Sequence, residues 1–371
     1  MGLKIKKSGA KYSAIVGIGE KLSLLERDSN DKYLRLNRGI PAVTNIDLTE
    51  IIPLIDFNQA DIQIYPPNSG HPKLKAAINK YYFQSSTQDE NIFITAGGIN
   101  ALDLVFKTID TEKVILPEFY WGAYANILKI NQQKSEFYNS FEELTNNLSE
   151  LKDSTILICD PNNPLGNKYD DTMLLDTVSK LNANGTSIIW DSPYRKLFYD
   201  ENDEFYSQLK EFEHLIIVES FSKSIGLSGQ RLGFVHSTNK DFNKELNINI
   251  LYATNGINNF AQILVEKILS TKEGQKAAKE FRDKTIKEMQ LNIEYLRNNK
   301  LLAEEFYQSS TPIGIFTVVN KSEEELLKHK IGSVGLYYFT QTNKELGEKY
   351  ARLCIAVPHK DLKAYFDTLI K

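Results

Sequence analysis

Short apolar runs alternate with segments of helical spacing through the middle of this chain. Such alternation is typical of βαβ units, in which helices cover both faces of a mainly parallel sheet. The runs expected to be strands are Asn91–Thr95, Lys113–Leu116, Thr155–Cys159, Ser187–Trp190, Leu215–Val218 and Leu232–Val235. Helical spacing follows the first two runs, at Ala101–Thr108 and Trp121–Ile130. We therefore predict an α/β fold whose large domain contains a mainly parallel, doubly wound sheet.

The pattern changes after Asn255. A long helical stretch, Ile257 to Asn298, comes first and is interrupted by Gly274. Three apolar runs then indicate strands of a smaller α+β unit, namely Gly314–Val319, Gly335–Phe339 and Leu353–Val357. Residues 1–45 have no strong periodicity, and we expect them to pack with that unit. The predicted domains are 46–275, the large one, and 1–45 together with 276–371, the small one.

Composition argues against several classes of protein. The 371 residues are 42% apolar with a formal net charge of −4, and no long basic run is present to bind nucleic acid. The two cysteines, Cys159 and Cys354, make neither a disulfide framework nor a metal-binding spacing. The N-terminus lacks the apolar region of a signal peptide, and no apolar run approaches the ~20 residues of a membrane span. We expect a cytoplasmic protein that binds no metal, membrane or nucleic acid.

One lysine stands in an unusual electrostatic setting after the strand expected at Leu215–Val218. Lys223 lies between two serines and eight residues before Arg231. Because like charges repel, this is a poor surface pattern. It suits an amine that must lose its proton to bond a carbonyl, beside hydroxyls and a guanidinium that hold a phosphate. Pyridoxal 5'-phosphate (PLP) is an aldehyde that carries a phosphate; a solvated lysine is the alternative interpretation.

Other unusual residues also follow expected strands, where α/β sheets bind ligands. Gly97 and Gly98 open a helix, whose free N–H groups either bind an anion or simply form a tight turn. Asn163, between two prolines, either donates into the site or only shapes a loop. Asp191 is either a helix N-cap or the partner of a protonated pyridine nitrogen, with Tyr194 donating to the ring oxygen.

Two further positions suit a flat ring and a carboxylate. Trp121 would stack on a flat cofactor, although Phe119 and Tyr120 compete for that role and core packing is the alternative. Arg352 enters an apolar strand, where a charge needs a partner. It is either part of a structural salt bridge or a bidentate clamp for a substrate carboxylate.

Taken in order, these segments resemble the fold-type I, PLP-dependent aminotransferases of the class I/II group over most of the chain. Residues 220–233 are similar to the family's Ser-x-Ser-Lys-x-x-Gly-Leu-x-Gly-x-Arg-x-Gly signature, and residues 161–166 to its Pro-x-Asn-Pro-x-Gly loop. Residues 191–194 match its Asp-x-x-Tyr pair, residues 95–98 its phosphate-loop helix start, and Arg352-Leu-x-x-Ala its carboxylate-binding arginine.

The chain also departs from the family pattern at three places. Asp160 precedes the asparagine loop where Asn or Ser is commoner, and Ser192 follows Asp191 where glutamate is frequent. More residues than usual separate Pro117 from Trp121, which leaves the stacking aromatic open.

The resemblance implies roles for individual residues. Lys223 would form a Schiff base with PLP and then move protons, and Asp191 and Tyr194 would be catalytic with it. The implied cofactor contacts are Gly97, Gly98, Ile99, Trp121, Asn163, Asp191, Tyr194, Ser220, Ser222, Lys223 and Arg231. The implied substrate contacts are Arg352, Asn163 and Gly39. Tyr65 is similar to a tyrosine that reaches the cofactor phosphate of the neighbouring subunit, which implies a homodimer with shared active sites.

The leading hypothesis from the sequence is amino transfer from an L-amino acid to a 2-oxo acid. Another PLP reaction, by a β-lyase, a decarboxylase or an oxygen-using deaminase or hydroxylase, would keep all of these residues. A third alternative is a non-catalytic ligand-binding regulator. Regulators that resemble these enzymes carry an added DNA-binding domain, and we expect none here, because little chain remains and no basic helix precedes the enzyme-like region.

Overall fold

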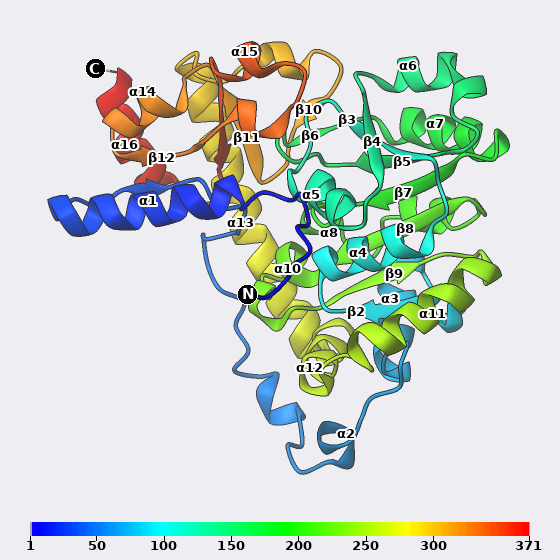
Figure 1. Cartoon of the computed structure of the whole chain (residues 1–371). Helices are drawn as coiled ribbons and strands as arrows, with labels where there is room; N and C mark the ends of the chain where they lie inside the picture. The colour runs from blue at the N-terminus through cyan, green and yellow to red at the C-terminus, as the bar shows by residue number, and fades with distance from the viewer. Residues whose placement is uncertain (1, 371) are drawn as a thin grey trace.

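A seven-stranded sheet forms the centre of the computed structural model, which describes residues 2–370 (Figure 1). The strand order is β2-β9-β8-β7-β5-β3-β4. The bounds are Ile92–Thr95 for β2, Lys113–Pro117 for β3, Lys134–Tyr138 for β4, Ser154–Cys159 for β5, Ser187–Asp191 for β7, Leu215–Ser220 for β8 and Gly233–His236 for β9. Only β9 runs antiparallel to its neighbours, β2 and β8. The predicted α/β fold with a mainly parallel sheet is confirmed.

Burial explains which strands the sequence revealed. Every residue of β5 and β8 is buried, so these central strands have the continuous apolar character of a sheet covered on both faces. Strand β4 lies at the edge, and its residues Lys134 to Glu136 are exposed or half-buried. The apolar-run criterion missed β4 because an edge strand keeps polar side chains.

Helices cover the sheet and carry its connections (Figure 1). Their bounds are Pro72–Phe83 for α3, Gly98–Thr108 for α4, Ala123–Ile130 for α5, Asp171–Ala183 for α7, Lys240–Thr254 for α11, Asn259–Ser270 for α12 and Lys272–Asn298 for α13. The stretch from Ile257 is therefore two helices, and the expected interruption at Gly274 was wrong. The break is at Thr271, whose hydroxyl accepts the N–H of Gly274 at 3.1 Å as an N-cap. Gly274 instead allows close packing, because a Cβ there would lie 2.4 Å from the carbonyl oxygen of Lys267.

The smaller unit contains an antiparallel sheet in the order β11-β14-β13. Its strands are Phe316–Val319 (β11), Val334–Gly335 (β13) and Ala351–Cys354 (β14), and helices Glu323–Lys328 (α14), Lys344–Gly347 (α15) and His359–Ile370 (α16) accompany them. The strand expected at Gly335–Phe339 was wrong, because Leu336–Phe339 is a 3-10 helix. Leu336 and Phe339 are buried three residues apart while Tyr338 is exposed, which fits the three-residue repeat of that helix.

The N-terminal region has more structure than its sequence indicated. Helix α1, Ala14–Ser29, buries Ile18 and Leu22 on one face, so the absence of periodicity inferred for residues 1–45 was wrong. Strand β1, Leu34–Arg35, pairs in parallel with β12, Ile331–Gly332, beside the smaller unit. The remaining short elements are Ile52–Leu54 (η1), Ala60–Gln63 (α2), Asp89–Asn91 (η2), Phe141–Asn146 (α6), Leu148–Glu150 (η3), Asn167–Lys168 (β6), Arg195–Phe198 (α8), Phe205–Leu209 (α9), Phe221–Ser224 (α10), Ser228–Gln230 (η4), Glu304–Tyr307 (η5) and Thr311–Pro312 (β10).

Within residues 2–370, no helix combines the length and the apolar character needed to cross a bilayer. No group of three or more His, Cys, Asp or Glu side chains in that range is arranged to hold a metal ion.

Candidate active site

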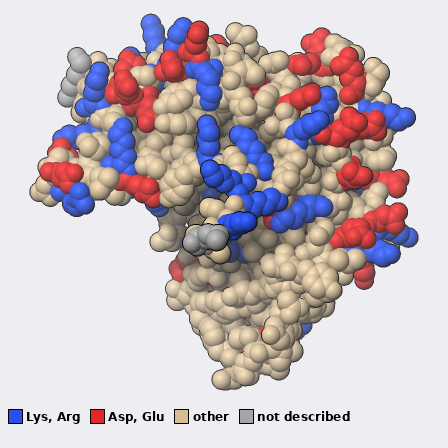
Figure 2. Space-filling view, in the orientation of Figure 1, with Lys and Arg blue, Asp and Glu red and all other residues tan. Residues whose placement is uncertain are grey.

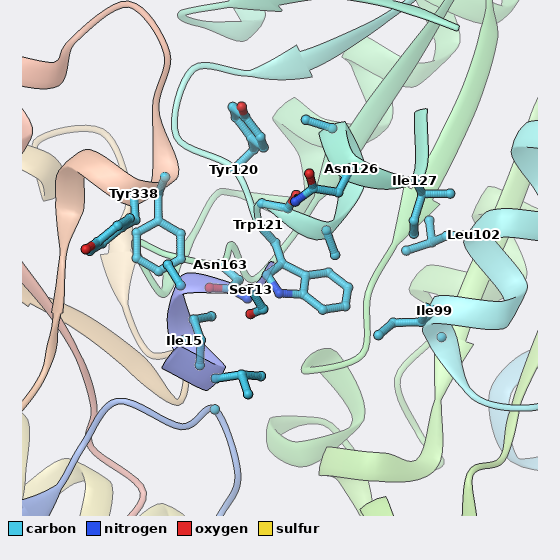
Figure 3. A pocket seen from close by; sticks show the side chains of 18 of the residues that line it. Ser13, Ile15, Ile99, Leu102, Tyr120, Trp121, Asn126, Ile127, Asn163 and Tyr338 are labelled. Atoms are coloured by element: carbon cyan, nitrogen blue, oxygen red, sulfur yellow. The ribbon is translucent and has the colours of Figure 1, made fainter. Parts of the chain in front are cut away.

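A cavity of about 1130 Å³ opens at the carboxyl ends of the parallel strands, next to the smaller unit. The indole of Trp121 lies in its middle, with Ser13 and Ile15 on one side and Ile99, Leu102 and Ile127 on the other (Figure 3). Of the residues expected from the sequence, those lining it are Gly39, Gly98, Ile99, Trp121, Asn163, Asp191, Tyr194, Ser220, Ser222, Lys223, Arg231 and Arg352. The fold thus brings together residues as far apart in the sequence as Gly39 and Arg352.

Two expected residues do not line this cavity. Gly97 lies directly behind it: its φ is +82°, and a Cβ there would come within 2.9 Å of the Arg231 guanidinium. Only glycine fits this backbone angle and this close approach. Tyr65 lies elsewhere on the surface and is 81% exposed, so it does not serve the cavity of its own chain.

One end of the cavity has the character of an anion site. Helix α4 starts there, and its first N–H groups have no partner within the helix. The Ser220 hydroxyl donates to that of Ser222 at 2.9 Å, so both oxygens lie together beside Gly98. Arg231 donates to the Ser228 carbonyl at 2.9 Å and forms no ion pair with any acid in residues 2–370. A phosphate would satisfy all of these donors.

Lys223 lies in α10, directly after β8, and is partly exposed into the cavity. Desolvation of the ammonium is the main cause that lowers its pKa, to about 8, and the charges of Arg231 and Arg352 act in the same direction. The nearby Cys354 acts in the opposite direction. A sizeable fraction of the Lys223 amine is therefore uncharged, and so nucleophilic, at mildly alkaline pH.

Asp191 ends β7 and is buried at the bottom of the cavity. Burial raises the pKa of its carboxyl to about 7, while a hydrogen bond donated by Tyr124 acts against that rise. No basic side chain in the described chain pairs with Asp191, so a protonated ring nitrogen is the cation it lacks.

The structure separates the three aromatic candidates for stacking. Phe119 packs edge-on against Phe306, and Tyr120 stacks on Phe137 while its hydroxyl accepts a hydrogen bond from Gln341. Tyr120 and Trp121 both line the cavity, and the Trp121 indole lies 5.6 Å from the ring of Tyr124, which contacts Asp191.

Arg352, Asn163 and Tyr194 form a hydrogen-bonded series across the cavity. Arg352 Nη1 donates to Asn163 Oδ1 at 3.2 Å, and Asn163 Nδ2 donates to the Tyr194 hydroxyl at 3.3 Å. Arg352 is fully buried, and its Nε has no hydrogen-bond partner. No acid within residues 2–370 pairs with it, and burial lowers its pKa to about 10. A buried guanidinium in this state calls for an anionic ligand.

Sequence reasoning missed residues that complete the site. Tyr124 lies three residues after Trp121, in the first turn of α5, and its hydroxyl donates to Asp191. Phe316 stacks under the Arg352 guanidinium at 4.3 Å and leaves no room for a Cβ on Gly39. The Asn37 carbonyl accepts a hydrogen bond from Arg352. No single-sequence signal marks Phe316 or Asn37, since both act through contacts distant in sequence.

These residues fit PLP. The anion site suits its phosphate, the partly desolvated Lys223 amine suits its aldehyde, and the buried Asp191 carboxylate suits its ring nitrogen. The fold and this set of donors together define a PLP-dependent α/β protein. Residues 34–369 match the family described as aminotransferase class I and II, and the chain belongs to that family, whose members depend on PLP.

Individual relatives agree with the family assignment. The chain is 28% identical over 248 residues to an aspartate aminotransferase of Pyrococcus horikoshii, a match that covers 63% of each chain. It is 26% identical over 194 residues to a histidinol-phosphate aminotransferase of Haemophilus influenzae, covering 49% of this chain and 52% of that one. Alignments with curated relatives thus span between about half and 63% of their length. The structure of an aspartate aminotransferase from Thermus thermophilus with maleate has a TM-score of 0.83 at 19% identity, covering 100% of this chain and 99% of that one, and confirms the fold.

Proposed function

We propose that this protein is an aminotransferase that moves an amino group from an L-amino acid to a 2-oxo acid with PLP. The observation that carries the proposal is Arg352, a fully buried guanidinium without an acidic partner in the described chain, in the same cavity as Lys223. A carboxylate held by Arg352 would place the α-amino group of a substrate near that lysine.

Each residue then has a defined task. When bound, the cofactor supplies an aldehyde that accepts the amino group and a ring that takes up the electrons of the broken bond. Lys223 would hold the cofactor at that aldehyde, and its amine is placed to move a proton at the substrate α-carbon. Asp191 would hold the ring nitrogen with its proton, and Trp121 would lie against the ring. Asn163 and Tyr194, which are hydrogen-bonded to each other, would hold the ring oxygen, and Arg352 would orient the substrate.

The amino-acid or oxo-acid substrate carries a second anionic group in this proposal. Four basic residues line the mouth of the cavity beyond those already assigned, and they are Lys11, Arg38, Lys129 and Lys344. None of them forms an ion pair with an acid in residues 2–370, and Figure 2 shows Lys and Arg gathered beside the N-terminus. Burial and then the charge of Lys11 lower the pKa of Lys344, while Glu118 opposes this. The names of the relatives, aspartate and histidinol-phosphate aminotransferases, also denote anionic substrates.

Matched substrates test that part of the proposal. L-glutamate against L-glutamine, and O-phospho-L-serine against L-serine, differ chiefly in the distal charge. We expect about tenfold or greater kcat/KM for the preferred anion, a preference that weakens with salt because the basic residues are exposed. Equal rates within both pairs would contradict the anionic substrate alone and leave amino transfer intact.

We also propose a cytoplasmic homodimer. Free, buried thiols at Cys159 and Cys354 support the compartment. The exposed Tyr65 supports the dimer, because it is available to a second copy and not to its own cavity.

A single-turnover experiment tests amino transfer against the other PLP reactions. Purified protein loaded with PLP is mixed with an amino acid in the absence of any oxo acid. We expect one oxo acid per active site and then no further reaction until a 2-oxo acid is added. Continued turnover with oxygen uptake, carbon dioxide release or loss of a β-substituent would contradict the proposal. Lys223→Ala is the control and is expected to lose the burst.

A further inference from the structure

Two of the positions where the sequence departs from its family meet directly beneath the site. The Ser192 hydroxyl donates to the Asp160 carbonyl at 2.6 Å, and both residues are fully buried. Asp160 lies three residues before Asn163, and Ser192 lies two residues before Tyr194. The two departures therefore link the loops that carry the two ring-contacting polar groups.

A buried ion pair continues from the first of these loops. One Asp160 oxygen lies 3.1 Å from Lys168 Nζ, and the other accepts the backbone N–H of Tyr169 at 3.0 Å. Lys168, itself buried, also donates to the Asp171 carboxylate at 2.6 Å. The asparagine loop is thereby connected to the start of α7.

Arg195 connects the same helix to the second loop. It directly follows Tyr194, is fully buried, and donates to both oxygens of Asp171 at 2.9 and 2.8 Å. Two more hydrogen bonds, at 2.8 and 2.7 Å, go to Asp203. The guanidinium carbon lies 4.3 Å and 4.0 Å from the ring centres of Tyr199 and Phe205, so it is held on every side.

We propose that Lys168 and Arg195 are positioning residues: through Asp160 and Asp171 they fix the separation of the two loops and so orient Asn163 and Tyr194 toward the ring oxygen of the cofactor. The inference rests on the proposed function, because it assigns a purpose to the Asn163–Tyr194 hydrogen bond at 3.3 Å. Charged, bidentate contacts suit this task, since their geometry is more restrictive than that of apolar packing. A plain turn after β5 would need none of these groups.

Neutral replacement of Lys168 alone, and of Lys168 together with Asp160, distinguishes an effect on loop position from an effect on the stability of the whole protein. Lys168→Met leaves the Asp160 carboxylate buried without its charge partner, whereas the double variant Lys168→Met with Asp160→Asn removes both charges. Lys180→Met is the matched control, because Lys180 forms an exposed ion pair with Asp176 on the same helix, α7. For each protein we would measure thermal unfolding without cofactor, the affinity for PLP, and the pH midpoint of the visible absorbance of bound PLP.

We expect Lys168→Met to raise the pH midpoint by about one unit, because weaker donation to the ring oxygen stabilises the protonated cofactor linkage. PLP affinity should fall about tenfold with it. The double variant removes the unpaired buried charge and should recover the unfolding temperature, but it lacks the ion pair and should keep most of both changes. Lys180→Met should show neither. A lower unfolding temperature with an unchanged midpoint and affinity would overturn the proposal.

A milder change covers the case in which Lys168→Met does not fold. Ser192→Ala removes only the hydroxyl that bonds the Asp160 carbonyl, and we expect it to shift the midpoint in the same direction by a smaller amount. No shift in Ser192→Ala would then overturn the proposal. Failure of the unaltered protein to bind PLP would instead contradict the proposed function, so the two outcomes are distinct.

Discussion

Three basic side chains, Lys223, Arg231 and Arg352, share one cavity, and none forms an ion pair with an acid anywhere in residues 2–370. Their mutual repulsion costs free energy that bound anions would relieve. The arrangement also prepares the lysine for its role, because the two guanidinium charges make its ammonium form less favourable. The repulsion among these three basic side chains therefore destabilises the empty cavity and also makes Lys223 more reactive.

The lowered pKa of Lys223 predicts a pH dependence for cofactor attachment. Attachment needs the uncharged amine, whose fraction falls about tenfold per pH unit below a pKa of about 8. The rate at which cofactor-free protein reacts with PLP should therefore rise with pH and level off above about pH 8. Stopped-flow absorbance measures this rate. A midpoint near 10.5, the ordinary value for lysine, would contradict the inferred setting of Lys223.

Among the helices and strands, those that the sequence predicted best are the strands buried on both faces of the sheet. Strands β5, β7 and β8 are continuous apolar runs, and the polar residues just after them line the cavity as expected. Strand β4 and helix α1 were missed because each exposes much of its surface, so their apolar pattern is weak. The apolar run Gly335–Phe339 was wrongly assigned, since a short apolar run does not distinguish a strand from a 3-10 turn.

The residues of the site likewise fall into those that the sequence predicts and those that it does not. Motif residues such as Lys223 and Asp191 could be predicted because their spacing within one segment carries the signal. The connection from Asp160 through Lys168 to Arg195 could not, since it joins three segments through side-chain geometry that only the folded chain defines.

The close packing of the loop that carries Asn163 leads to a prediction about Gly166. Gly166 closes it with a φ of +70°, and a Cβ there would lie 1.8 Å from the Phe316 carbonyl oxygen in the smaller unit. Gly166→Ala should destabilise the protein by about 1–3 kcal/mol from overpacking, in addition to backbone strain, and weaken PLP binding. Gly185→Ala is the control, because its φ is +80° but no atom lies within 4 Å of the added Cβ. Equal losses on urea unfolding would show that strain alone matters and the contact with Phe316 does not.

For the whole molecule, the distribution of charge and apolar surface favours a second copy of the chain. The surface over α2 and α12 shows almost no charged side chains in Figure 2. Phe57, Ile64 and Tyr65 lie on either side of α2 and are 51%, 60% and 81% exposed. The segment that carries them packs against α11 and α12, since Asn68 donates to the Asn247 carbonyl at 2.7 Å and Phe57 stacks on Phe260. An apolar surface this exposed is typical of an interface.

If that interface lets Tyr65 reach the partner's cavity, two defective chains should restore each other. A Lys223→Ala chain lacks the amine and a Tyr65→Ala chain lacks the tyrosine, but in a mixed dimer one site receives an intact Lys223 from its own chain and an intact Tyr65 from the other. Random reassortment makes half of the dimers mixed, with one complete site in each, so activity should return to about a quarter of the unaltered level. The measurement is activity of the two chains after unfolding and refolding together, compared with the sum of each refolded alone. Recovery no greater than that sum, with dimers confirmed by light scattering, would mean that Tyr65 does not act across the interface.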